Sequence, residues 1–379
     1  MREVLVETKL GQYIHINTGK LDVNAASEFG EYPFFTCSRE TYRIDQAAFE
    51  GESVLVAGNG DLNVKYYDGK FNAYQRTYVL NSVDREILDN RFLFLYLQTY
   101  IEYLRSETRG TVIQYLKKGQ FTDAKIKLPP LSEQKRIVDL ISSVDSYIEA
   151  LQKHLMNAKR SRNAVLHELL TAGGEGWVET SLGEIAEVIG GGTPSTTIGE
   201  YWDGDIVWLT PTEITSQDGK VVSDSIRKIT DLGFKNSGAQ MLPKDSVILT
   251  SRASVGFVAL AGKELCTNQG FQSLIPKPSV LSKFLMFWIQ LNRLEFESRS
   301  AGSTFKEISK SNVKSIKLGL PPLPEQKRIV EIVNTIDEVI SQTELTTSKA
   351  QNLRSGLLSD LLSGDHVIPV SYDKIMGAA

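Results

Sequence analysis

Three short patterns in the sequence combine residue types that can do chemistry. Glu133-Gln134-Lys135, with Asp123 upstream, has the Glu-x-Lys spacing of metal-dependent nucleases. The glycine triplet at 190–192 is of a kind that can cradle a nucleotide phosphate. The stretch from Gly256 to Gly262-Lys263-Glu264 approaches a P-loop, in which four residues separate the glycines and a Ser or Thr follows the lysine.

None of the three patterns is complete. Five residues separate Gly256 from Gly262, and the carboxylate of Glu264 would repel phosphate. Pro194 breaks any helix that would offer its N-terminus to phosphate, so a turn is favoured after the glycine triplet. The Glu-x-Lys pattern opens a helix, and a second copy of this segment has Ser315 in place of the upstream aspartate. We therefore favour a helix start that also forms an interaction surface, and we expect the chain to be non-catalytic, with no metal or cofactor of its own.

The second copy belongs to an internal repeat. Residues 128–138 (LPPLSEQKRIV) and 320–330 (LPPLPEQKRIV) match at ten of eleven positions, and the match continues without a gap at an offset of 192 residues. Such self-similarity indicates a duplication. Upstream, the offset drifts; the paired positions include Ser53 with Ser246, Gln75 with Gln269, and Leu10-Gly11 with Leu182-Gly183.

Each well-matched block is predicted to be a long amphipathic helix. Apolar residues recur at three- and four-residue steps over 137–155 and 329–340. About 40 residues of helix span roughly 60 Å, and an amphipathic helix of that length must bury its apolar stripe. Because a block of about 145 residues separates the two helices, an antiparallel coiled coil is favoured. The alternative is that each helix packs only on its own domain.

The remaining blocks mix strand and helix signals. SVLVA at 53–57 and SVILT at 246–250 are predicted buried strands, and 92–104 and 284–294 are predicted buried helices. The predicted fold class is α+β, with two similar domains, two long helices and an internal pseudo-twofold repeat. The expected parts are a first domain at 1–127, helix one at 128–174, a second domain at 175–319, helix two at 320–364, and a tail at 365–379 that either folds back beside the N-terminus or is frayed.

Composition limits the class of protein further. The chain has 379 residues, 42 Lys and Arg against 46 Asp and Glu, and a net charge of −4. That balance weighs against a non-specific nucleic-acid coat but allows basic groups on one face. Two cysteines exclude a disulfide scaffold and a cysteine-rich zinc module. The N-terminus lacks the apolar segment of a signal peptide, and the longest apolar stretch is too short to cross a membrane, which predicts a cytoplasmic protein.

With Leu-Pro-Pro-Leu-x-Glu-Gln-Lys-Arg-Ile-Val present twice, the chain resembles the specificity subunit of a type I restriction–modification system. The resemblance covers nearly the whole chain, and residues 250–276 also resemble a recurring stretch of such domains. One departure is that 57–60 in the first domain (AGNG) stands in place of 250–253 (TSRA). Contacts inferred for one domain therefore do not transfer automatically to the other.

The resemblance implies a mechanism. Each target-recognition domain would read one half of a split, asymmetric DNA target, while the paired helices hold the domains apart and inverted. Two methyltransferase subunits would dock on the helices and use S-adenosylmethionine, and restriction subunits, where present, would use ATP and magnesium. The chain itself would be a non-catalytic specificity subunit.

Base reading requires Arg, Lys, Asn and Gln at groove edges, and the helix starts are expected to contact partner subunits. The predicted DNA-binding residues are Asn59, Gln75, Arg76, Arg105, Arg109, Lys117 and Lys118 in the first domain, and Arg252, Asn268, Gln269, Arg299, Lys306 and Lys310 in the second. The predicted partner-binding residues are Glu133, Lys135, Arg136, Glu325, Lys327 and Arg328. Two alternatives stay open: an interaction scaffold whose domains do not read DNA, and a fused enzyme with an unrecognised site.

Overall fold

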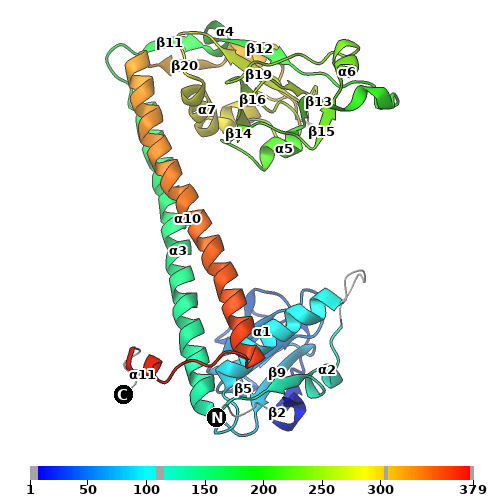
Figure 1. Cartoon of the computed structure of the whole chain (residues 1–379). Helices are drawn as coiled ribbons and strands as arrows, with labels where there is room; N and C mark the ends of the chain where they lie inside the picture. The colour runs from blue at the N-terminus through cyan, green and yellow to red at the C-terminus, as the bar shows by residue number, and fades with distance from the viewer. Residues whose placement is uncertain (1–6, 108–114, 303–305, 376–379) are drawn as a thin grey trace. The chain divides into compact units, whose positions relative to one another are not determined.

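The computed structural model of the chain describes residues 7–107, 115–302 and 306–375 (Figure 1). They fall into two compact units: unit 1 is Met1–Gln152 with Leu345–Ala379, and unit 2 is Lys153–Glu344. Each unit contains one mixed domain and one half of each long helix, α3 (Leu131–Thr171) and α10 (Leu323–Ser363). Unit 1 is therefore built from two separate stretches of chain.

The domain of unit 1 is built on two four-stranded sheets, ordered β2-β9-β6-β7 and β4-β3-β8-β5, and a β1-β10 pair. Its strands are β1 (Glu7–Lys9), β2 (Ile14–Thr18), β3 (Tyr32–Phe35), β4 (Thr41–Ile44), β5 (Phe49–Glu50), β6 (Ser53–Ala57), β7 (Val64–Tyr67), β8 (Lys70–Ala73), β9 (Thr77–Ser82) and β10 (Lys125–Lys127). Its helices are α1 (Asn90–Glu107), α2 (Lys118–Thr122), α11 (Ser371–Ile375) and the 3₁₀ turns η1 (Leu10–Gln12) and η2 (Val23–Ala25).

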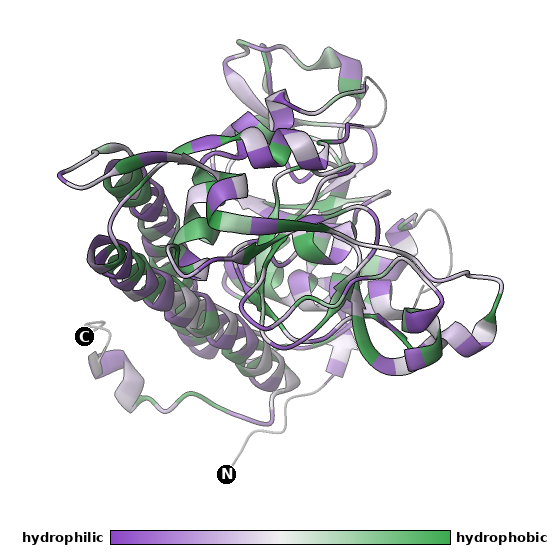
Figure 2. Ribbon diagram, turned by 90° about the horizontal axis from the view of Figure 1, so that it is seen from above, coloured by the Kyte–Doolittle hydropathy of each residue, from purple (hydrophilic) through white to green (hydrophobic). Residues whose placement is uncertain are grey.

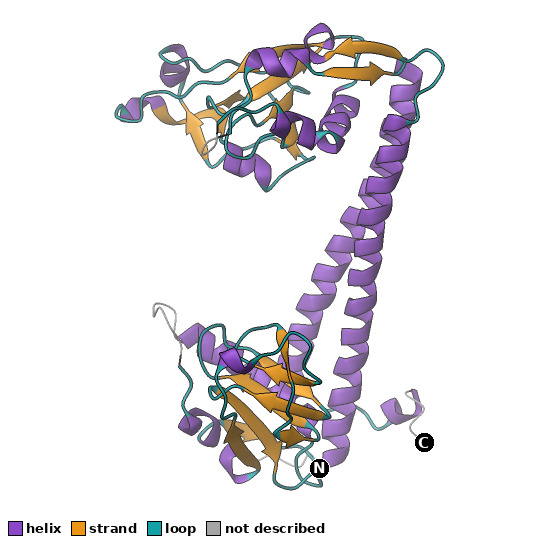
Figure 3. Cartoon of the chain, turned by 180° about the vertical axis from the view of Figure 1, so that it is seen from behind, coloured by secondary structure: helices purple, strands orange, loops and turns teal. Residues whose placement is uncertain are grey.

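The domain of unit 2 has sheets ordered β12-β19-β16-β17-β14 and β15-β13-β18, and a β11-β20 pair (Figure 3, strands in orange). Its strands are β11 (Val178–Ser181), β12 (Ala186–Gly190), β13 (Trp202–Leu209), β14 (Val221–Val222), β15 (Arg227–Ile229), β16 (Val247–Leu249), β17 (Val258–Ala261), β18 (Cys266–Thr267), β19 (Gln272–Pro276) and β20 (Lys317–Leu320). Its helices are α4 (Leu182–Ile185), η3 (Gly199–Tyr201), α5 (Pro211–Thr215), α6 (Asp231–Lys235), α7 (Ser282–Leu291), α8 (Arg293–Ser298) and α9 (Lys310–Ser315).

The two domains share one topology. The order β2-β9-β6-β7 in unit 1 matches β12-β19-β16-β17 in unit 2, which adds the short edge strand β14. The two units share a parallel strand pair, β3 with β8 and β13 with β18, and in unit 2 the added strand β14 is also parallel to its neighbour β17. Similar folding of the two halves, the α+β class and the duplication are therefore confirmed. The helix expected at 284–294 is interrupted at Asn292, which separates α7 from α8.

Sequence signals account for both ends of the long helices. Pro130 and Pro322 precede the first turns, and each proline carbonyl accepts the N–H of the glutamate three residues later, at 2.9 Å. After the last turns, Gly173 and Gly364 adopt φ of +65° and +74°, a conformation that glycine tolerates best. The helices therefore begin just after these prolines and end before these glycines, inside the expected ranges 128–174 and 320–364.

Within each unit, the halves of α3 and α10 run antiparallel and share the core of the domain. Arg354 of α10 forms an ion pair with Asp145 of α3 in unit 1, and Arg162 of α3 pairs with Asp337 of α10 in unit 2. Each arginine also donates to a glutamine of the domain's buried helix, from Arg354 to Gln98 at 3.2 Å and from Arg162 to Gln290 at 3.4 Å. The two contacts are equivalent in the repeat, and the predicted antiparallel pairing is confirmed.

Apolar residues join the helices to the domains. Ile137, Ile141 and Leu358 belong to the main core of unit 1, and Leu166 and Ile329 to that of unit 2. Figure 2 shows hydrophobic and hydrophilic residues alternating along both long helices. In the described parts of the chain, no helix is both long and apolar enough to cross a membrane.

Candidate nucleic-acid interface and partner surface

In unit 1, three loops that are distant in the sequence are hydrogen-bonded into one surface. Gly58, just after β6, donates its N–H to the carbonyl of Arg76 and accepts the N–H of Leu116, both at 2.8 Å. Asn59 and Tyr115 form an isolated antiparallel bridge beside these bonds. We call this surface junction 1 and define it as residues 58–59, 75–76 and 115–118.

The same surface exists in unit 2. Ser251, just after β16, donates its N–H to the carbonyl of Gly270 at 2.7 Å and accepts the N–H of Ile308 at 3.0 Å. Arg252 and Glu307 form the corresponding antiparallel bridge. We call this surface junction 2 and define it as residues 251–252, 269–270 and 307–310.

The backbone hydrogen bonds show which residues of the two junctions are equivalent. Gly58 matches Ser251 at an offset of 193, Arg76 matches Gly270 at 194, and Leu116 matches Ile308 at 192. These are the offsets that the sequence repeat predicts. The junctions thus gather Asn59, Gln75, Arg76, Lys117 and Lys118 in unit 1, and Arg252, Gln269 and Lys310 in unit 2, with Asn268 and Lys306 directly beside them.

Junction 1 surrounds a hollow of about 340 Å³, whose lining includes Thr18, Gln75, Arg76 and Tyr115. Gln75 and Arg76 are exposed, and the guanidinium carbon of Arg76 lies 5.8 Å from the ring centroid of Tyr115, a cation–π distance. Gln75 also donates to Asp22 at 3.3 Å. The hollow therefore presents an arginine, an amide and an aromatic ring to solvent.

Junction 2 presents a different set of groups. The Arg252 side chain, 46% exposed, forms an ion pair with Glu307 at 2.8 Å. Gln269 is exposed and accepts a hydrogen bond from the Thr193 hydroxyl. The Asn268 side-chain oxygen accepts the Gly270 N–H at 2.8 Å, so this asparagine shapes its own loop.

In each unit, one glycine packs tightly against the backbone next to the junction. A Cβ at Gly19 would lie 1.7 Å from the carbonyl oxygen of Ala73, and a Cβ at Gly191 would lie 2.0 Å from that of Asn268. Both glycines thus abut the backbone just before the loop that carries Gln75 or Gln269. Part of the glycine triplet is thereby explained as a close approach of two backbones, in keeping with the expected turn.

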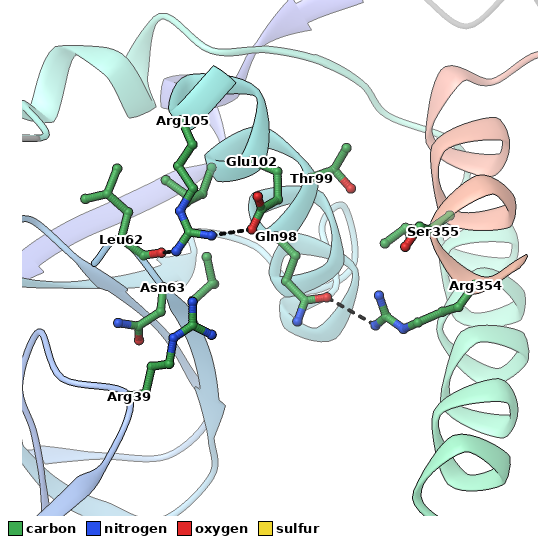
Figure 4. A pocket seen from close by; sticks show the side chains of 12 residues that line it. Arg39, Leu62, Asn63, Gln98, Thr99, Glu102, Arg105, Arg354 and Ser355 are labelled. Atoms are coloured by element: carbon green, nitrogen blue, oxygen red, sulfur yellow. Dashed lines mark hydrogen bonds and ion pairs between the residues drawn. The ribbon is translucent and has the colours of Figure 1, made fainter. Parts of the chain in front are cut away.

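Two of the predicted arginines lie outside the junctions. Arg105 donates to Glu102 at 2.6 Å, to Asp61 at 2.7 Å and to the carbonyl of Leu62, at a groove of about 540 Å³ (Figure 4). Arg39, and to a smaller extent Arg105, hold the pKa of Asp61 below its ordinary value. Arg299 contacts Glu295 at 2.6 Å and Ser315 at 3.3 Å. Arg109 lies outside the described residues.

The start of each long helix is fixed by a glutamine that sequence reasoning passed over. Gln134 is fully buried, accepts the Asp89 N–H at 2.9 Å, and donates to the carbonyls of Ile87 and Pro129 at 2.7 and 2.9 Å. Gln326 makes the same three bonds, with Leu281 at 2.8 Å and with Ser279 and Pro321 at 3.0 and 2.8 Å; these partners lie 192 residues further on. The signal was present in the repeat itself, since glutamine is identical in both motifs.

The predicted partner-binding residues have different surroundings in the two copies. At the start of α3, Arg136 forms two hydrogen bonds with Asp373 of the tail, at 2.7 and 2.9 Å, and one with Glu133 at 3.1 Å. At the start of α10, Arg328 lies 3.5 Å from Glu325 and is 67% exposed. Lys135 and Lys327 are exposed in both copies.

Tyr115 is a second residue that the sequence analysis missed. It belongs to junction 1 only because the loop before α2 returns to β6, a contact that local patterns do not report.

Among residues 7–107, 115–302 and 306–375, no group of three or more His, Cys, Asp or Glu side chains is arranged to hold a metal ion.

Comparison with known proteins gives a family match in both halves. A family model described as "Type I restriction modification DNA specificity domain" matches residues 4–158 and again 174–353. Among curated proteins, the chain is 27% identical to the specificity subunit of the type I restriction enzyme EcoDI of Escherichia coli, over 94% of this chain and 87% of that protein. It is 37% identical to the specificity subunit of MjaIX of Methanocaldococcus jannaschii over 43% of this chain and 38% of that protein.

Solved structures show the same fold. The S subunit of a type I restriction–modification system from M. genitalium matches with a TM-score of 0.59 and 18% identity, over 94% of this chain and 96% of that chain. A chain from a study of assembly and conformational transition of the type I system matches with a TM-score of 0.64 and 18% identity, over 95% and 98%.

Proposed function

The chain belongs to the type I restriction modification DNA specificity family, and we propose that its two units read the two halves of a split, asymmetric DNA target. DNA target recognition follows from the family. The two-part reading, with residues 1–127 and 175–319 as the recognition domains, is our inference. The observation that carries it is that both units have the same backbone junction with different side chains on it.

The residue types on the junctions suit base reading in the major groove. Arginine pairs with guanine and asparagine or glutamine with adenine through paired hydrogen bonds. Junction 1 offers Asn59, Gln75 and Arg76, and junction 2 offers Arg252 and Gln269. Gln75 and Gln269 are equivalent, but Asn59 stands opposite Arg252 in the repeat and Arg76 opposite Gly270, so the two half-sites should differ in sequence.

Lysines at the edges of the junctions suit the DNA backbone. Lys117 and Lys118 in unit 1 and Lys306 and Lys310 in unit 2 are exposed. Phosphate contacts fix the protein on the duplex without reading its sequence. We assign Arg105 and Arg299 to holding the fold, because both lie outside the junctions and each donates to acceptors within its own domain.

The remaining parts of the proposal concern partners. The helix starts, including Lys135 and Lys327, would dock two methyltransferase subunits, and restriction subunits would join them. S-adenosylmethionine, ATP and magnesium would be bound by those partners, in the cytoplasm. Two matching helix starts in one chain, each with an exposed lysine, support docking of two copies of one partner. At the first start this docking would use the surface around Lys135, because Glu133 and Arg136 contact the tail.

Methylation mapping tests the two-part reading. The chain would be co-expressed with its methyltransferase subunit in a methylation-free host, and modified adenines would be mapped genome-wide. The wild type should give one split motif with a fixed gap. Gln75→Ala with Arg76→Ala should relax only one half of that motif, and Arg252→Ala with Gln269→Ala only the other.

Matched controls are Lys70→Ala, at the far end of β8 from junction 1, and Lys244→Ala, in the turn before β16. Both should leave the motif unchanged. Unmodified DNA despite a soluble complex with an active methyltransferase would favour the scaffold alternative. Loss of both half-sites in each junction variant would contradict the division between the units.

A further inference from the structure

The C-terminal tail occupies a defined site at the start of α3 in unit 1. The backbone N–H of Ile368 donates to the Glu133 carboxylate at 2.7 Å, and the Ile368 side chain is buried in the unit 1 core. Figure 1 shows the tail leaving the end of α10 and running to this helix start. The sequence left two alternatives for the tail, which were folding back beside the N-terminus and fraying. The tail is docked, and the part of unit 1 that it contacts is the start of α3.

Charge complementarity holds the other end of the tail. Both carboxylate oxygens of Asp373 accept from the Arg136 guanidinium, in the fork geometry that gives strong and specific ion pairs. Between these two anchors, Tyr372 is half-buried and lies beside Asp139 and Ser143. We define the tail site as Glu133, Arg136, Asp139 and Ser143.

The same chemistry recurs at the start of α10. The residues 192 positions further on are Glu325, Arg328, Glu331 and Thr335, which keep the glutamate and the arginine and replace Asp by Glu and Ser by Thr. We call this set the open site. All four lie near the start of α10, with the same spacing along the helix as the residues of the tail site on α3.

The open site lacks the cover that the tail gives to its counterpart. The Arg328 side chain is 67% exposed and Glu325 33%, against 15% for Arg136 and 9% for Glu133. Among the residues that the structure describes, Arg328 alone forms an ion pair or hydrogen bond with the Glu325 carboxylate, at 3.5 Å. Leu323 in the first turn of α10 is also exposed.

We propose that the open site binds a tail-like segment of a partner protein. The segment would be extended, would give a backbone N–H to Glu325, and would place a carboxylate five residues later on Arg328, as Ile368 and Asp373 do in unit 1. That the partner is the methyltransferase subunit rests on the proposed function. The tail would then be a built-in occupant of the first of two equivalent sites, kept there by the high effective concentration of a tethered segment.

A peptide of residues 364–375 is the direct probe, because it contains the full set of contacts. Titrated into the intact chain, the labelled peptide should bind with a stoichiometry of one by fluorescence anisotropy. A chain ending at Gly364 should bind two. Arg328→Asp should weaken binding to the intact chain by at least about tenfold, since the fork with aspartate is lost.

Charge reversal keeps the test independent of folding. A peptide with Asp373→Arg should fail to bind the wild type but bind the Arg328→Asp chain. Absence of peptide binding to the intact chain would overturn the proposal, and so would binding that Arg328→Asp leaves unchanged. The assay contains neither DNA nor methyl transfer, so its failure would leave the proposed DNA reading intact, and a failed methylation assay would leave the peptide result standing.

Discussion

Junction 1 and junction 2 have the same backbone hydrogen bonds but different side chains. The bridge that joins Asn59 to Tyr115 in unit 1 joins Arg252 to Glu307 in unit 2. A neutral pair, one member of which is aromatic, thus stands where the other unit has an ion pair. Because backbone groups hold the three loops together, the exposed side chains can change while the surface stays formed.

The long helices show the opposite behaviour. The Arg354–Asp145–Gln98 contact of unit 1 is reproduced residue for residue by Arg162, Asp337 and Gln290 in unit 2. The glutamines that fix the helix starts are also identical. The two units thus have identical side chains at the contacts that hold the long helices, and different side chains on the loops that face solvent.

The largest expected effect tests the sameness of the helix starts. Gln134→Leu or Gln326→Leu removes three buried hydrogen bonds and leaves backbone groups unpaired, which should lower the free energy of unfolding of the affected unit by about 3 kcal/mol or more. Hydrogen exchange resolved by unit would measure it. The exposed neighbours Lys135→Ala and Lys327→Ala should cost about 0.5 kcal/mol or less. Unequal losses from the two glutamine variants would break the equivalence.

A smaller effect is expected from the ion pairs between α3 and α10. Arg354→Ala and Arg162→Ala should each cost about 1–2 kcal/mol, because the arginines are largely buried while their aspartate partners stay partly hydrated. Urea unfolding followed by unit-specific probes would measure both. The exposed Arg160→Ala on α3 serves as the control. A loss confined to one variant would show that one helix pairing dominates.

An exchange of side chains between junctions sharpens the contrast. Asn59→Arg with Tyr115→Glu puts the unit 2 pair onto the unit 1 backbone. Both positions are at the surface, so stability should change by only about 0.5 kcal/mol, whereas methylation mapping should show an altered first half-site. An unchanged half-site would mean that this bridge does not contribute to reading, and unfolding would mean that the junction depends on its side chains.

The smallest effect concerns the pH dependence of the tail. The Arg136 guanidinium holds the pKa of Asp373 below its ordinary value of 3.8. A lowered pKa means that the stabilising ion pair is complete above pH 3.8 and is lost as the pH falls through the lowered value. The hydrogen-exchange protection factors of residues 365–375, which correct for the intrinsic effect of pH on exchange, should thus be the same at pH 7 and pH 5. Release between those values would contradict this, and Asp373→Asn should loosen the tail at both.

The repeat made much of the fold predictable. Identity at an offset of 192, together with the drift at Gln75 and Gln269, is enough to align equivalent strands, helices and loops from the sequence alone. The spacing of apolar residues and the flanking proline and glycine predicted the long helices, because these signals are local.

Contacts between distant segments were less predictable. The Arg136–Asp373 pair joins residues 237 apart, and Tyr115 reaches Asn59 only through the fold of the domain. The charge of Arg105 favours a DNA contact, and the sequence does not show that Asp61 and Glu102 contact it in the fold. Periodicity reports which face of an element is buried but not which element covers it.

Unit 1 is discontinuous in the chain, and this has a consequence for biosynthesis. The ribosome completes Met1–Gln152, then all of unit 2, and only then Leu345–Ala379. Unit 2 is thus fully synthesised before unit 1, although Met1–Gln152 of unit 1 precedes it in the chain. During that delay Ile137 and Ile141 lack the cover of Leu358 and Leu361, so the nascent chain exposes an apolar surface until the second stretch of unit 1 is translated.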